Sequence, residues 1–137
     1  MDYKIWALLS ALFAGITAVL AKRGVEGVPA NTALFVRVAF VLVFSVTLAL
    51  AAKEANLTNL TRENWIFLAL SAVATWLSWL CYFRALQAGT VSQVAPIDKL
   101  SFVIAMILGF VVLKEKFEPK TAVGAGLIVA GVLITLK

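Results

Sequence analysis

Three charged side chains lie inside long apolar stretches of the sequence: Arg37, Asp98 and Lys99. A charge near the centre of a bilayer costs about 3 kcal/mol on insertion scales, so such residues usually face a cavity or a partner. Arg37 lies about 9 Å, and Asp98 about 10 Å, from the start of its apolar block, at a helical rise of about 1.5 Å per residue. If both blocks begin at the same membrane face, the two side chains reach equal depth.

Two interpretations of this cluster remain open. In the functional one, Arg37 and Asp98 bind a polar substrate or carry a coupling proton. In the structural one, they form an ion pair, and Lys99 extends to the near interface. Adjacent residues point about 100° apart on a helix, so Asp98 and Lys99 cannot both face one partner. Lys99 therefore fits the structural interpretation better.

Pro96 lies two residues before Asp98. Proline has no backbone N–H, and its ring clashes with the preceding helical turn. The alternatives are a tolerated first-turn proline and a mild helix kink beside Asp98, and the sequence favours the kink. Broken helices are frequent at the binding sites of transporters.

Four aromatic residues follow one another at spacings of three, three and one: Trp76, Trp79, Tyr82 and Phe83. On a helix they lie along one side, where they could line a pocket or contact a cation. They could instead form an aromatic belt at the membrane interface, which suits Tyr82 and Phe83. Trp76 is too central for a belt. We therefore predict a substrate-binding or coupling site that contains Arg37, Trp76, Trp79, Asp98 and Lys99.

The elements that must position these residues are long apolar blocks. The chain has 137 residues, of which 63% are hydrophobic and 14% charged, and a mean hydropathy of +1.01. The blocks lie at about 5–21, 31–52, 65–83, 91–113 and 121–136. Each is close to the roughly 20 residues that cross a bilayer as a helix, and none alternates as a barrel strand does. We predict an all-α integral membrane protein with one domain (1–137), five transmembrane helices and termini on opposite faces.

The residues that are missing narrow the function. The chain has no histidine and a single cysteine, Cys81, so a disulfide framework and a His/Cys zinc site are excluded. No Walker loop is present, and no nucleophile–histidine pair can be assembled. We expect no enzyme activity, no cofactor and no metal.

The net charge is +5, and its distribution bears on topology. Most basic residues lie at the ends of apolar blocks, where they suit lipid head groups and not nucleic acid. Five crossings place six basic residues on one face and four on the other: Lys4, Lys53, Arg62, Lys114, Lys116 and Lys120 against Lys22, Arg23, Arg84 and Lys137. The positive-inside rule therefore favours a cytoplasmic amino terminus only weakly.

Several motifs together resemble a known family. They are Trp6 before a small-residue helix, the run 82–89 (YFRALQAG), the run 94–101 (VAPIDKLS), Lys114-Glu115, and the glycines from Gly124 to Gly131. In this combination the chain resembles the EamA domain of the drug/metabolite transporter superfamily, most specifically over 82–115. The resemblance implies a secondary transporter, often an exporter, of small metabolites. Most members carry two five-helix units, and this chain is similar to the short single-unit bacterial and archaeal branch.

One departure limits the comparison. Small multidrug-resistance relatives carry a carboxylate in their first helix, and 5–21 has none, so proton-coupled efflux of cationic drugs by that route is not expected. We predict an exporter of small polar metabolites in the inner membrane of a prokaryote, acting as a homodimer of half-size units. The weak charge bias permits an antiparallel pair. The alternative is a non-transporting membrane scaffold or regulatory subunit; substrate, direction and coupling ion stay open.

Overall fold

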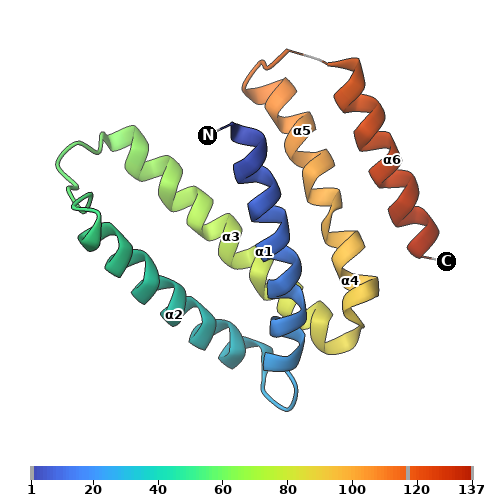
Figure 1. Cartoon of the computed structure of the whole chain (residues 1–137), viewed down its shortest axis with the longest axis horizontal. Coiled ribbons are helices and arrows are strands. Elements are labelled where there is room, and N and C mark those ends of the chain that lie inside the picture. The colour runs from blue at the N-terminus through green and yellow to red at the C-terminus, as the bar shows by residue number, and fades with distance from the viewer. Residues whose placement is uncertain (1, 117, 137) are drawn as a thin grey trace. The chain divides into compact units, whose positions relative to one another are not determined.

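All regular structure in the described part of the chain is helical. The computed structural model describes residues 2–116 and 118–136. Its helices are α1 (Tyr3–Gly24), α2 (Ala30–Ala51), α3 (Arg62–Ala88), α4 (Val91–Asp98), α5 (Leu100–Val112) and α6 (Pro119–Thr135) (Figure 1). Helices α4 and α5 share the fourth predicted block. The predicted all-α fold with five membrane helices is therefore confirmed for the described residues.

Short polar and proline signals set where the helices begin. Pro29, with φ −56° and ψ 138°, lies just before α2 in an extended conformation. At the start of α3 the Thr61 hydroxyl accepts the backbone N–H of Asn64 at 3.2 Å, as an N-cap does. At the start of α4 the Thr90 backbone N–H donates to Gln93 Oε1 at 3.1 Å, which is one half of a capping box. The loops can therefore stay short while the first N–H groups of these helices find acceptors.

Length and composition suit a bilayer. Three single helices, α1, α2 and α3, and the combined span Val91–Val112 are each long and apolar enough to cross a membrane. Helix α6 has 17 residues, or about 25 Å at 1.5 Å per residue. That is at the short end of what crosses a hydrocarbon core of about 30 Å, where local thinning or tilting of neighbours absorbs the mismatch.

The chain forms two compact units, each described by itself. The α2–α3 unit comprises Leu20–Ala88, and in it α2 and α3 run antiparallel and pack against each other (Figure 1). The α4–α6 unit comprises Met1–Val19 and Gly89–Lys137, and in it α4 and α5 both pack against α6.

One end of the α2–α3 unit is tied by two side chains. Lys22 Nζ donates to the Leu86 carbonyl at 2.6 Å, and Gln87 Nε2 donates to the Val28 carbonyl at 2.7 Å. The last carbonyls of a helix lack partners within the helix, so the lysine satisfies one that α3 leaves open. Gly27, at φ 72°, lets the connecting loop turn sharply enough for both bonds.

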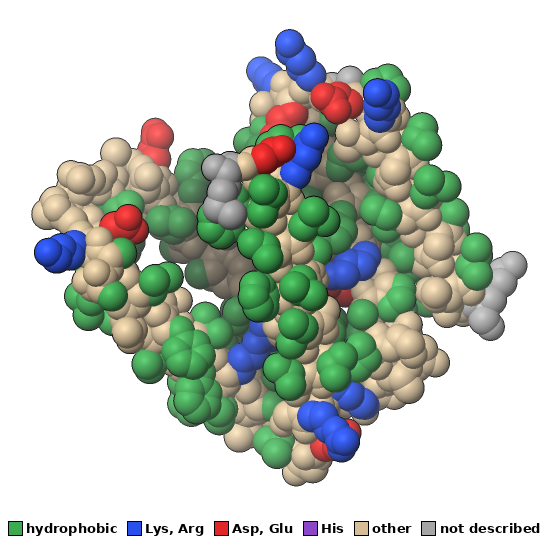
Figure 2. All heavy atoms as spheres, viewed as in Figure 1, with side chains coloured by type: hydrophobic (Ala, Val, Ile, Leu, Met, Phe, Trp, Pro, Cys, Tyr) green, Lys and Arg blue, Asp and Glu red, His purple; other side chains and the backbone are tan. Residues whose placement is uncertain are grey.

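Large apolar side chains point outward over most of each helix. Leu48, Phe67 and Leu127 are each about 70% exposed. Figure 2 shows hydrophobic side chains along the visible face of α6. Contiguous exposed apolar surface would drive aggregation in water, whereas acyl chains solvate it. The chain is therefore a multi-pass membrane protein.

The five-crossing topology predicts which loops share a membrane face. Cysteines placed singly at Lys53 and Lys116, in a Cys81→Ser background, should label equally with an impermeant maleimide. Cysteines at Gly27 and Gly89 should show the complementary labelling, because one crossing separates each from its neighbour. Unequal labelling at positions 53 and 116 would contradict the topology, and labelling after membrane lysis serves as the control for reactivity.

Candidate functional site

Arg37 contacts two aromatic rings of the neighbouring helix. It lies about two turns into α2, and its guanidinium carbon is 4.3 Å from the ring centre of Trp79 and 5.4 Å from that of Phe83. Trp79 and Phe83 are four residues apart in α3, so they share one face of that helix. Both distances are within the roughly 6 Å at which a cation is attracted to a ring face. The packing of α2 on α3 thus places the charge against π-electrons.

The N–H donors of Arg37 are not used by the contacts with the two rings. Within residues 2–116 and 118–136 its guanidinium makes no ion pair and no hydrogen bond, and the side chain is partly exposed. A guanidinium carries five N–H donors in one plane and accepts nothing. Because rings attract a cation through its face, the N–H edge stays available to an acceptor from outside the described chain.

The second charged group belongs to the α4–α6 unit. Lys99 Nζ is 3.7 Å from Asp98 Oδ2, and the two side chains are 41% and 38% exposed. Lys99 Nζ also lies 5.3 Å from the ring centre of Phe102. The ammonium group therefore contacts both a carboxylate and an aromatic ring, and its extension to the near interface stays a prediction.

The predicted fourth helix is interrupted at Lys99. The Lys99 N–H bonds the Pro96 carbonyl and the Phe102 N–H bonds the Lys99 carbonyl, both at 3.1 Å. Each bond reaches back three residues, as in a 3₁₀ turn, instead of the four of an α-helix. Pro96 cannot donate to the Ser92 carbonyl one turn earlier. The interruption thus lies three residues after the proline and beside Asp98.

The predicted site residues fall into two groups. Arg37 and Trp79 are in contact within the α2–α3 unit, and Asp98 and Lys99 are in contact within the α4–α6 unit. The Arg37–Asp98 pair would join the two units and stays a prediction. Trp76 is 52% exposed, and no ring contact of it is found in the described residues, so its role also stays a prediction.

Phe83 is absent from the predicted site residues. Its sequence position suits an interfacial belt as well as a cation contact, and in the structure it is 2% exposed and contacts Arg37. Its spacing of four from Trp79 was the signal that could have found it, since residues at that spacing share a helix face.

Comparison with known proteins identifies the family. Residues 3–137 match the model of the EamA-like transporter family. The chain belongs to the EamA-like transporter family. It is also 41% identical over 134 residues to a Sinorhizobium sp protein named "Uncharacterized transporter in cobO 3'region". The aligned region covers 97% of this chain and 95% of the relative. No solved structure matches this chain. The resemblance seen in the sequence is confirmed, and the EamA chain is a membrane transporter by family.

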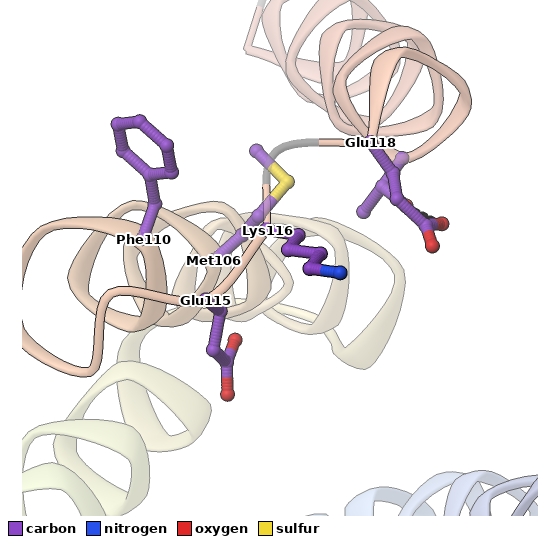
Figure 3. Close-up of a pocket in the computed structure, with 6 residues that line it drawn as sticks. Met106, Phe110, Glu115, Lys116 and Glu118 are labelled. Atoms are coloured by element: carbon purple, nitrogen blue, oxygen red, sulfur yellow. Dashed lines mark hydrogen bonds between the residues drawn. The ribbon is translucent and has the colours of Figure 1, made fainter.

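A different feature explains the Lys114-Glu115 motif of this EamA chain. The turn after α5 and the start of α6 enclose a cavity of about 230 Å³ (Figure 3), lined by Met106, Phe110, Glu115, Lys116, Glu118 and Thr121. The Glu115 N–H donates to the Gly109 carbonyl at 3.2 Å, and a Cβ at Gly109 would be 2.7 Å from Glu115 Oε2. Glutamate and glycine therefore close this turn together. Its charges place it at the membrane surface.

The Arg37–Trp79 contact should have a measurable coupling energy. A double-mutant cycle of Arg37→Gln and Trp79→Leu should give a coupling of about 0.5–2 kcal/mol in the free energy of unfolding, because each single change removes the same cation–π contact. Unfolding can be followed by circular dichroism as the mole fraction of sodium dodecyl sulfate rises. The matched cycle with Trp76→Leu should give a coupling near zero, and equal couplings in the two cycles would contradict the assignment.

Proposed function

We propose that this EamA chain is a secondary transporter that exports small polar metabolites across the inner membrane of a prokaryote. The observation that supports it best is Arg37, a charge kept in a membrane-spanning helix without an ion partner among the described residues. Such residues are costly and mark substrate or ion pathways in membrane proteins. The transporter-named Sinorhizobium relative supports the same class of function.

The residues have separate roles in this proposal. Arg37 binds the substrate, and Trp76 and Trp79 line its path. Asp98 takes up and releases a coupling proton, and Lys99 lies beside it with its ammonium 3.7 Å from the carboxylate. The interruption at Lys99 resembles the discontinuous helices that many transporters place at their binding sites.

We propose further that the active form is a homodimer of oppositely inserted copies. Alternating access in many transporters uses two repeats of inverted topology. A unit with five crossings provides one such repeat, so a second copy inserted the other way completes the arrangement. The six-to-four distribution of basic residues between the faces allows both insertions.

The role of Asp98 can be separated from simple charge pairing. We expect Asp98→Asn to abolish transport while folded protein still reaches the membrane. If Asp98 only neutralised Arg37, the single change would leave an unpaired charge and destabilise the protein by about 3–5 kcal/mol.

The double variant Arg37→Gln with Asp98→Asn distinguishes the two roles. A functional pair predicts normal stability with transport still lost, measured in proteoliposomes. Recovery of transport to near the parent rate in the double variant would reject the functional role of both residues.

The dimer proposal predicts complementation between locked copies. Two lysines added to the 24–29 loop should fix one orientation and abolish activity alone, because the positive-inside rule then dominates. Co-expression with a copy carrying two lysines in the 52–61 loop should restore metabolite export. Two serines at the same positions are the control. Full activity of one locked variant by itself would show that the antiparallel pair is not required.

A further inference from the structure

The membrane-spanning part of the chain carries an uncompensated positive charge. Asp98 is the single acid that lies at least seven residues from both ends of a membrane-spanning segment; the others are Asp2, Glu26, Glu54, Glu63, Glu115 and Glu118. Two cations, Arg37 and Lys99, also lie at least seven residues from both ends of such a segment, whereas the other described basic residues lie within four residues of a helix end or outside the helices. Whichever cation Asp98 pairs with, one positive charge is left over. In the structure its carboxylate contacts Lys99, which leaves the charge on Arg37.

The shape of the Arg37 environment indicates what neutralises that charge. Trp79 and Phe83 attract the guanidinium through π-faces and use none of its N–H donors. They also hold it against one side of α3, so little side-chain freedom is lost when a ligand binds. Two parallel N–H groups on the edge of a guanidinium match the two oxygens of a carboxylate.

We propose that the transported substrate bears a single carboxylate, which Arg37 binds through two parallel hydrogen bonds. This assignment rests on the proposed transport function and names its substrate class. While Asp98 is ionised, one carboxylate balances the one surplus charge, whereas a phosphate monoester brings about −1.5 to −2 and overcompensates it. A cation would be repelled by the same surplus.

The binding test uses the full chain, purified in detergent, and isothermal titration calorimetry. The probes are four monocarboxylates (acetate, propionate, lactate and benzoate), each paired with its uncharged amide, and inorganic phosphate. At least one carboxylate should bind saturably while its amide does not. Arg37→Gln should abolish this binding, and Arg37→Lys should weaken it about tenfold or more, since an ammonium cannot form the paired bonds.

Arg23→Gln provides the matched control. Arg23 belongs to the same unit, but its side chain is 81% exposed and pairs with Glu26 at 3.5 Å at the membrane surface. This variant removes an equal charge and should bind the carboxylate as the parent does. Circular dichroism and size-exclusion profiles of Arg37→Lys establish that the charge-conserving variant is folded.

Each remaining outcome overturns the inference. These outcomes are equal binding of acid and amide, retained binding in Arg37→Gln, preference for phosphate, and no binding by any carboxylate. Uptake of a neutral or cationic metabolite into vesicles of phosphatidylethanolamine and phosphatidylglycerol would reject the carboxylate while leaving the transport function standing. Carboxylate binding without uptake of that carboxylate would reject the transport function and leave the Arg37 site standing.

Discussion

A peptide group in the hydrocarbon of a bilayer has no water to bond, so its N–H and C=O must find partners within the protein. A continuous α-helix pairs these groups within one segment, and this requirement explains most of the architecture of the chain. Helices occupy the apolar blocks, and the connections are confined to short polar segments whose caps, such as Thr61 and Thr90, accept or donate the bonds that helix ends lack. The backbone hydrogen bonds depart from the four-residue α-helical pattern at Lys99, inside the fourth apolar block and three residues after Pro96, which lacks a backbone donor.

The same absence of water governs the charged side chains. Aromatic rings take over part of the solvation that water would supply, since their π-faces attract cations without needing hydrogen bonds. Arg37 contacts Trp79 and Phe83, and Lys99 contacts Phe102. The two cations that lie deepest within the membrane spans thus contact rings, although they belong to different units. They differ in the second partner: Lys99 has the carboxylate of Asp98, and Arg37 has none in the described residues.

The helices were predictable because the length of an apolar run is a property of the chain alone. Their ends were less so. The sequence predicts a helix over 65–83, because Arg84 and Gln87 suit a polar helix end. In the structure α3 covers Arg62–Ala88. Arg84 is an exposed residue within α3, and the Gln87 side-chain amide donates to the Val28 carbonyl. Polar residues near the membrane surface do not stop a helix whose backbone is already paired.

The residues of the Arg37 contact could be named from the sequence, but which of them touch could not. Arg37 and Trp79 were both named from the sequence, but Trp76 was favoured over Trp79. Which of two tryptophans on one side of α3 meets Arg37 depends on the register between α2 and α3, and a three-residue shift along a helix moves a side chain by about 4.5 Å. That register is fixed by packing and by ties such as Gln87 of α3 to the Val28 carbonyl just before α2, which no periodicity reveals.

Aromatic support of Arg37 also suits a carrier that must let go of what it binds. If a carboxylate of the chain held the guanidinium, the substrate would first have to displace it. If nothing held it, the empty carrier would contain a bare charge in the membrane. Ring faces avoid both difficulties, because they contact the cation through its face and leave its edge to the substrate. The cation–π contacts are compatible with both the empty and the loaded proposed transporter, so the charge stays stabilised when the edge is empty, and the substrate binds without displacing a partner of Arg37.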